Sequence, residues 1–444
     1  MGVQSRPAPI AQRRRIFYGW WMVVAGLAMS LVNGALYAYG FSAYVRPLTQ
    51  EFGWTRTAIS GVISLSRLEG GILSPVAGFL IDRFGPRRMM LLGVSLVALG
   101  FMALSGVQDF LSFTLVYVLI LSLGSSFGTI APIQTALANW FIRKRSFVLG
   151  LLFAGIAMGG LLVPVVNFII EQHTWRGAAM VSGFVFLAVG VTSALAMRHR
   201  PEDYGYLPDG DTASGVAVDA EAGSAGGQRT APTEVDFTPR DALRTRAFWL
   251  ISFAFMLWSM LPSIITVHLI IFLTDVGFEP QLAANIFAVY AVTSGVFRVL
   301  VGWAGDRVNK RYLLTGAWVV QVIGLFLLAN VNTILDVVPF ILVFAPAYGG
   351  VVPLRGALQG EYFGRKHFGT IAGLIRVVDL AGNVGGPVAV GWAFDNAGGV
   401  EGYRLAFRVI AALNLLGALA ILAAVPPVLR RREEATGSEP RLRV

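Results

Sequence analysis

The sequence predicts an all-α membrane protein with twelve transmembrane helices in two similar six-helix bundles. Three observations carry this prediction: the chain is very apolar, it contains twelve apolar runs of membrane-spanning length, and its two halves repeat. Of 444 residues, 55 % are hydrophobic and only 14 % are charged, whereas soluble domains contain about 25 % charged residues. The 51 glycines agree with this class, because glycine is commoner in membrane helices than in soluble ones.

Each apolar run is long enough to cross a hydrocarbon core of about 30 Å as a helix, and a helix satisfies its own backbone polar groups in lipid. The first run follows three arginines, as a signal peptide would, but it is too long and lacks a cleavage site, so we expect a retained first helix. The runs lie at about 18–45, 57–81, 89–107, 112–134, 147–170 and 177–197, and at about 247–273, 282–304, 312–330, 336–358, 369–393 and 404–425.

A hydrophilic stretch separates the two sets of six runs. Its middle is rich in Gly, Ala and Asp and has no apolar period, so it cannot bury enough surface to fold alone. The sequence therefore predicts five parts: an amino-terminal tail, a bundle, a disordered linker, a second bundle and a basic tail. Their expected bounds are 1–16, 17–197, 198–246, 247–426 and 427–444.

The positions of Lys and Arg predict the orientation. Of the 35 basic residues, 26 fall in the tails, the linker and alternate loops, four fall in the opposite loops, and five lie inside spans. An excess of positive charge marks the cytoplasmic side. We therefore expect a multi-pass protein of the cell inner or plasma membrane, with both termini and the linker cytoplasmic, acting as a monomer.

The two halves repeat a loop motif. "GFLIDRFGPRR" after the second run recurs as "GWAGDRVNKR" after the eighth, with Gly78 and Asp82 displaced by 224 residues to Gly302 and Asp306. Repeated six-helix units related by an axis along the membrane normal are typical of duplicated transporters. The motif resembles the loop signature of the major facilitator superfamily, and the resemblance covers nearly the whole chain.

The resemblance gives the motif residues a role in a cytoplasmic gate. Small glycines allow close helix approach, and Asp82 and Asp306 could then meet the positive amino ends of helices 11 and 5. The alternative is that these residues only fix the topology. In similar carriers an acid near the end of helix 10 pairs with motif arginines, so we expect Glu361 to pair with Arg307 or Arg365. The expected gate residues are Gly78, Asp82, Arg83, Gly302, Asp306, Arg307 and Glu361.

Within the superfamily, four phrases resemble the bacterial monocarboxylate transporter and oxalate/formate antiporter branch. They are "FYGWWMVV", "FSAYVRPLTQEFGWTRTAIS", "RPEDYGYLPDGD" and "GEYFGRKHFGTIAG". The branch implies transport of organic anions, often with a proton. Arg298 matches its substrate-carboxylate arginine. Two departures put the animal-type proton route in doubt: Ser294 stands where the family has an aspartate, and Tyr39 where some animal members have a lysine.

Ionisable residues inside the membrane are functional candidates, because burying them is costly. Arg298 lies about 12 Å from the loop at Asp306, with no acid three or four positions away on its helix. Its planar guanidinium suits a carboxylate; the alternative is an acid on another helix. Arg376 and Asp379 lie three residues apart, so we expect them to pair, or Asp379 to exchange its partner for a proton. Glu69 is either paired between helices or a proton carrier.

The amino-terminal half offers uncharged polar groups instead of charges. We expect cations of the second half to hold an acid group and the first half to receive the organic body. His268 is expected to be a hydrogen-bonded spectator rather than a proton relay. The expected substrate contacts are Arg298, Tyr39, Tyr37, Asn33, Gln134 and Arg376, and the expected proton carriers are Asp379 and Glu69.

Several function classes are excluded or disfavoured. The chain has no Cys, so thiolate metal sites and Cys nucleophiles are absent; no second His lies near His268, which disfavours a metal. No phosphate-binding G-x-x-x-x-G-K-[ST] motif supports ATP drive. The net charge of +10 is spread over short loops rather than a nucleic-acid face. We expect no cofactor and no catalytic site, and a proton-coupled monocarboxylate carrier. Alternatives are an oxalate/formate-type antiporter, a drug or metabolite exporter, and a membrane nutrient sensor.

Overall fold

The computed structural model describes residues 17–211 and 236–427. The expected amino-terminal tail, the middle of the linker and the basic tail lie outside these residues. The described part is helical, without strands. It divides into two compact units: of the described residues, unit 1 holds 17–66 and 84–211, and unit 2 holds 67–83 and 236–427.

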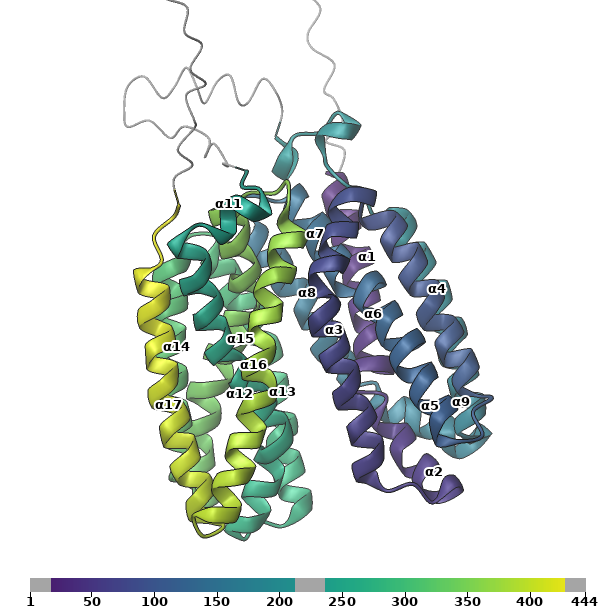
Figure 1. The fold of residues 1–444 in the computed structure, drawn as a ribbon, viewed down its shortest axis with the longest axis vertical. Helices are drawn as coiled ribbons and strands as arrows, with labels where there is room; N and C mark the ends of the chain where they lie inside the picture. Colours follow the sequence, from purple (N-terminus) through teal and green to yellow (C-terminus); the bar gives the residue numbers. More distant parts are fainter. Residues whose placement is uncertain (1–16, 212–235, 428–444) are drawn as a thin grey trace, which may run out of the picture. The chain divides into compact units, whose positions relative to one another are not determined.

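Unit 1 consists of helices that Figure 1 labels along the chain, and two of its membrane passes are locally wound as π-helices. In the first, Gly34 lies so close to α8 that a Cβ on it would overlap the carbonyl oxygen of Ile156. π-Helical turns are rare and often mark functional sites. The elements are α1 (Tyr18–Val32), η1 (Asn33–Ala38), α2 (Ser42–Phe52), α4 (Pro86–Leu104), α5 (Phe110–Leu115), η2 (Val116–Ser122), α6 (Leu123–Gly128), α7 (Ile130–Trp140), α8 (Arg145–Gly160) and α9 (Val163–Ala196).

The fifth and sixth passes meet at Thr174. The helix α9 is broken there, because Thr174 has φ +72° and ψ 158°. Positive φ is unfavourable for a β-branched residue, so this residue marks the turn between the two passes. The fifth pass therefore consists of α8 and the first part of α9, and residues 175–196 form the sixth.

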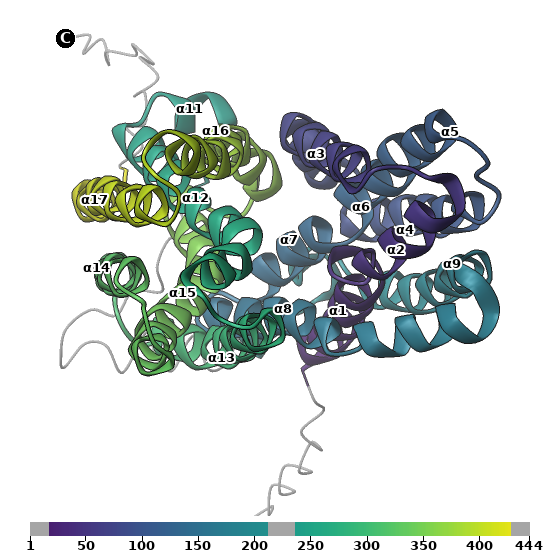
Figure 2. The same ribbon diagram turned by 90° about the horizontal axis from the view of Figure 1, so that it is seen from below.

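Unit 2 is a bundle of six long helices together with the second half of α3 (Arg56–Phe84). Helix α12 packs against α16, α13 against α15, and α14 against α15 and α17, as Figure 2 shows along the helices. The bounds are α12 (Arg246–Val276), α13 (Pro280–Gly305), α14 (Lys310–Ala329), α15 (Ile334–Phe363), α16 (Phe368–Asn396) and α17 (Val400–Ala423).

Ten stretches of the described chain are long and apolar enough to cross a membrane. One of them, 145–196, holds the two passes that meet at Thr174. Helix α3 is outside the ten; it has 29 residues and carries Arg67 and Glu69 near its middle. The ten stretches, with 145–196 counted as two passes, and helix α3 together account for the twelve predicted passes.

The flanks of the linker are folded, which corrects the expectation of disorder throughout 198–246. Short helices form before and after the undescribed middle: η3 (Glu202–Tyr204), η4 (Pro208–Gly210) and α11 (Pro239–Leu243). Aromatic residues explain the difference from the Gly/Ala/Asp-rich middle. The ring of Tyr206 lies 5.7 Å from that of Trp140, and Phe237 packs edge-on against Phe363 at 5.9 Å.

Candidate functional site

Arg298 lies buried on α13, with 8 % of its surface exposed. A glycine on α15 allows this helix to come close: a Cβ on Gly349 would overlap the carbonyl oxygen of Ser294 and lie 3.2 Å from the backbone nitrogen of Arg298. Such close approach is what small residues provide at membrane helix contacts. The backbone of α13 at Arg298 is therefore packed closely against α15, and the arginine side chain is buried in unit 2.

A second buried charge cluster lies on α15 and α16. Asp379, only 5 % exposed, forms an ion pair with Arg355 through Oδ2. The hydroxyl of Ser259 on α12 donates to the backbone carbonyl of Asp379 at 2.7 Å. The Arg355 guanidinium also lies 4.7 Å from the centre of the Phe255 ring. Helices α12, α15 and α16 thus converge on Asp379.

This arrangement corrects the expected pairing of Asp379 with Arg376. Helical side chains lean toward the amino end, so Arg376, three residues before Asp379, leans away from that carboxylate. An acid placed before a base pairs better than the reverse order. Arg355 approaches from the neighbouring helix and forms the ion pair, whereas Arg376 is exposed.

Arginines outnumber carboxylates in the middle of three helices of unit 2. Away from their ends, α13, α15 and α16 carry Arg298, Arg355 and Arg376 and one carboxylate, Asp379. Opposite charges stabilise each other strongly in a low-dielectric interior, so an excess of cations favours an anionic ligand. Glu69, half-buried on the part of α3 that belongs to unit 2, is the second expected proton carrier.

The expected contacts of unit 1 lie on or near its π-helices. Asn33 is 4 % exposed and lies in η1. Tyr37 of η1 is stacked with Tyr117 of η2, with ring centroids 6.3 Å apart. Tyr39 is 38 % exposed, and Gln134 is half-buried on α7. The π-helices therefore bring helices 1 and 4 together at a polar aromatic pair; the sequence did not predict Tyr117.

Asp82 meets the amino end of helix 11, the position that the sequence predicts for it. The backbone N–H of Gly369 donates to Oδ1 at 3.0 Å, and that of Thr370 donates to Oδ2 at 2.7 Å. The Thr370 hydroxyl also donates to Oδ2 at 2.7 Å. A Cβ on Gly78 would overlap the carbonyl oxygen of Gly369, so this glycine permits the contact between α3 and α16.

Glu361 has a different partner from the one expected. It forms an ion pair with Lys310 at 2.9 Å, between the end of α15 and the start of α14. Arg307 instead stacks on the Trp303 ring, 3.7 Å from its centre, and donates to the Trp303 carbonyl at 3.1 Å. Lys310 begins α14, so the fold carries it next to Glu361, which a comparison of motifs alone does not reveal.

The remaining motif residues lie at helix ends. Arg83, in the last turn of α3, lies 5.9 Å from the Phe79 ring centre. Gly302 is buried in α13, and Asp306 caps the carboxyl end of that helix. Both are thus placed where α13 ends.

His268 is a hydrogen-bonded histidine on α12. Its Nε2 lies 3.1 Å from the Pro387 carbonyl, and its Nδ1 lies 3.3 Å from the Tyr403 hydroxyl. Over residues 17–211 and 236–427, no group of three or more His, Cys, Asp and Glu residues could hold a metal ion.

Sequence reasoning missed the role of Arg355. It recognised this arginine as lying inside helix 10 but gave it no partner. The sequence did contain a signal, because a buried aspartate requires a cation. Either Arg355 in helix 10 or Arg376 in helix 11 could supply it. Only the packing of α15 against α16 distinguishes Arg355 from Arg376.

Comparisons with known proteins give matches over most of this chain. A sequence model described as Major Facilitator Superfamily matches residues 22–346 and, in a second match, 266–443. Monocarboxylate transporter 13 of Bos taurus is 28 % identical over 417 residues, covering 92 % of this chain and 90 % of that protein. The oxalate:formate antiporter of Oxalobacter formigenes is 23 % identical over 394 residues, covering 85 % and 86 %.

The fold also matches solved structures. The proton:xylose symporter XylE, bound to 6-bromo-6-deoxy-D-glucose, superposes with a TM-score of 0.72 over 92 % of this chain and 96 % of that one. The sequence identity is only 15 %, so this likeness concerns the fold alone.

Proposed function

Because this chain belongs to the major facilitator superfamily, we propose that it carries small organic anions, in particular monocarboxylates together with a proton, by alternating access. As a member of that family it is a membrane transporter of small molecules and not an enzyme. The observation that carries the proposal is the presence of three arginines and one carboxylate in the middle of α13, α15 and α16, with Arg298 the most buried of the arginines.

Arg298 is assigned the substrate carboxylate. Its planar fork can donate two parallel hydrogen bonds, which an ammonium cannot do with the same geometry. Arg376, exposed rather than ion-paired with Asp379, supplies further positive potential on α16. For the organic body of the substrate, the proposed contacts are the uncharged side chains Asn33, Tyr37, Tyr39 and Gln134.

Asp379 is assigned the coupling proton. It is buried and bound to an arginine that a substrate carboxylate could attract. When an anion competes for Arg355 or Arg376, the carboxyl loses part of its stabilisation and gains a proton more readily. Anion and proton binding then reinforce each other, as linkage requires. Glu69 is the competing carrier.

Alternating access supplies the path. The linker and both termini are assigned to the cytoplasmic side of the plasma membrane, from the distribution of Lys and Arg. The contact of Asp82 with α16 supports a gate at that side, and Gly302, Asp306, Arg307 and Glu361 are assigned to the same gate. The protein is expected to act as a monomer.

An oxalate/formate-type antiporter is the second candidate, since Arg298 and Arg376 could hold two carboxylates and a relative carries that name. An exporter of amphipathic compounds would be expected to have a mainly apolar cavity with an acid. The arginines of unit 2 argue against such an exporter. A membrane nutrient sensor that transports nothing is the alternative from a different functional class, and a flux measurement distinguishes it from a carrier.

The test is binding and flux with purified protein in proteoliposomes. A panel of aliphatic and aromatic monocarboxylates and dicarboxylates is measured against wild type, Arg298→Gln and the control Arg408→Gln. Arg408 lies on α17, is exposed and donates to Asn330 at 3.0 Å. Carboxylate flux that only Arg298→Gln abolishes supports the proposal. Flux of neutral or cationic compounds, with none of carboxylates, would overturn it.

A further inference from the structure

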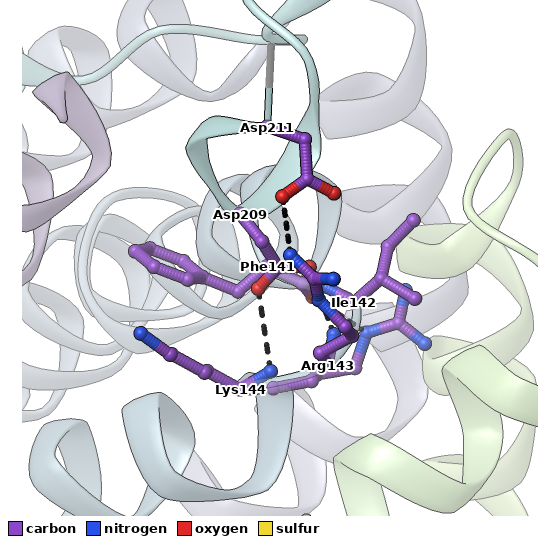
Figure 3. A network of polar contacts seen from close by, with 7 residues as sticks. Phe141, Ile142, Arg143, Lys144, Asp209 and Asp211 are labelled. Carbon is purple, nitrogen blue, oxygen red and sulfur yellow. Dashed lines mark hydrogen bonds and ion pairs between the residues drawn. The ribbon is translucent and has the colours of Figure 1, made fainter. Parts of the chain in front are cut away.

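Two aspartates of the linker bind two loops in the same manner. Asp209 accepts hydrogen bonds from three consecutive backbone N–H groups of the α7–α8 loop: Ile142 at 3.0 Å, Arg143 at 2.9 Å and Lys144 at 3.3 Å. Figure 3 shows the carboxylate facing this loop, with Asp211 paired to the side chain of Arg143. The Asp209 side chain is only 3 % exposed.

Asp236 does the same at the other end of the linker. It accepts from the backbone N–H groups of Arg365 at 2.8 Å and Lys366 at 2.9 Å, in the α15–α16 loop. The next residue, Phe237, donates its N–H to the Phe363 carbonyl at 3.0 Å. Each carboxylate thus binds the loop of its own unit.

The two loops occupy equivalent places in the repeat. Phe141, Arg143 and Lys144 correspond to Phe363, Arg365 and Lys366 at one common displacement. Both loops precede the amino end of a long helix, α8 in unit 1 and α16 in unit 2. Backbone N–H groups at such an end lack helical partners, and a carboxylate satisfies them with charge-assisted hydrogen bonds.

Asp209 keeps this contact in an unfavourable backbone conformation. Its φ is +59°, in the left-handed region, which costs free energy for residues other than glycine, although Asn and Asp tolerate it best. Strained residues persist where surrounding contacts fix them. The side chain-to-loop hydrogen bonds are such contacts.

In unit 2 the loop that Asp236 binds leads directly into the residues that bind Asp82. Asp236 binds the N–H groups of Arg365 and Lys366, and Asp82 binds those of Gly369 and Thr370. One six-residue segment therefore presents four backbone N–H groups to two carboxylates, one from the linker and one from α3. Fixing the first two N–H groups restricts the directions of the last two.

We propose that Asp236 is a positioning residue of the transporter: it holds the α15–α16 loop so that the amino end of α16 presents its N–H groups to Asp82. Asp209 is its counterpart on the α7–α8 loop and acts independently of Asp82. The linker thereby contributes to the contact between α3 and α16. The positioning role of Asp236 depends on neither the proposed substrate nor the proposed proton, and it can be measured without transport.

The chain offers a clean probe of the α3–α16 contact. It has no Cys, so one introduced thiol is labelled without background. Ser74 lies on α3, is 7 % exposed, and donates to the Gly373 carbonyl of α16 at 2.9 Å. A Ser74→Cys thiol is covered while the helices touch and becomes reactive toward N-ethylmaleimide when they separate.

A double-mutant cycle in this background tests the proposal. Asp82→Asn should raise the labelling rate about tenfold, because it weakens hydrogen bonds to a charged group. Asp236→Asn should raise it about threefold or more. The double variant should be labelled no faster than Asp82→Asn alone, because both residues act through one loop.

Asp209→Asn and Asp211→Asn are the matched controls. Both change linker acids of unit 1, and Asn tolerates the left-handed backbone at 209. They should leave the labelling of Ser74→Cys unchanged, and Asp209→Asn should instead speed hydrogen exchange of the Ile142–Lys144 amides. Size-exclusion profiles check that each variant is folded, and exchange of the Arg365–Thr370 amides in the detergent-solubilised protein gives a second readout.

Faster exchange at Gly369 and Thr370 in Asp236→Asn, with non-additive labelling, supports a positioning role. The proposal is overturned if Asp236→Asn leaves both the labelling and the Gly369–Thr370 exchange unchanged. It is also overturned if the effects of Asp236→Asn and Asp82→Asn multiply independently.

Discussion

Buried charge determines the chemistry of this protein at the scale of single residues. Arg298 and Asp379 are both more than nine-tenths buried, and burial of a charge is costly unless a partner of opposite charge is present. Asp379 has Arg355 as that partner. Away from the helix ends, α13, α15 and α16 carry three arginines and one carboxylate, and the proposal of an anionic substrate rests on this distribution.

Arg298→Lys is expected to weaken carboxylate binding about 10- to 100-fold. It keeps the charge but loses the bidentate fork, and hydrogen bonds between charged groups contribute about 1.5–3 kcal/mol. Isothermal titration with the best substrate of the panel measures the loss, and Arg408→Lys is the control. Unchanged affinity of Arg298→Gln for carboxylates would show that the anion binds elsewhere.

The Arg355–Asp379 pair yields a prediction about stability. Arg355→Gln and Asp379→Asn should each lower the free energy of unfolding by about 3 kcal/mol, because each leaves a buried charge without its partner. The double variant should recover most of this loss, because it leaves neither charge behind. Thermal unfolding in detergent measures the effect. Strictly additive losses would argue against a direct pair.

At the scale of elements, close contact of glycines controls how helices meet. A Cβ on Gly78 would overlap the Gly369 carbonyl oxygen, and one on Gly373 would overlap that of Ser74. Both positions lie on the contact between α3 and α16. Small residues at such contacts allow the backbones to approach, which brings Asp82 to the amino end of α16.

Gly78→Ala and Gly373→Ala should therefore push α3 and α16 apart and cost about 1–3 kcal/mol through overpacking. In the Ser74→Cys background, Gly78→Ala should raise the labelling rate. Gly385→Ala is the matched control on α16, because its added Cβ meets nothing within 4 Å. Equal labelling rates of the Gly78→Ala and Gly385→Ala variants would contradict a tight contact at Gly78.

At the scale of the whole molecule, the asymmetric distribution of Lys and Arg predicts the orientation. A reporter fused after residue 215 should be cytoplasmic, and one in the Asp275–Pro280 loop should be on the opposite side. Alkaline phosphatase and fluorescent-protein fusions give complementary signals for the two sides. An external reporter at residue 215 would refute the two-by-six layout.

The proposed coupling also belongs to the scale of the whole molecule, because it would link the proton to movement of the substrate. Asp379→Asn should lose uptake driven by a pH gradient yet keep substrate counterflow, because the neutral side chain can complete exchange without carrying a proton. Glu69→Gln is the comparison. If Asp379→Asn still accumulates substrate on a pH gradient and Glu69→Gln does not, Glu69 carries the proton.

The sequence by itself determined the class of protein, the helical passes and the family. These follow from local properties: the length of each apolar run, the charge of each loop, and a motif repeated at one displacement. It also made Arg298 and Asp379 candidates for function, because an ionisable residue within an apolar run is visible in the sequence itself. The place of Asp82 at helix 11 followed from the motif.

Tertiary structure alone decided which charges meet. Arg376 lies three residues from Asp379, but the ion pair forms with Arg355, 24 residues away in the chain; likewise Glu361 meets Lys310. The sequence did not indicate the loop contacts of Asp209 and Asp236, since an acid in a polar linker is ordinarily solvated. Side-chain direction and helix packing select each partner in three dimensions, and neither is encoded in spacing along one helix.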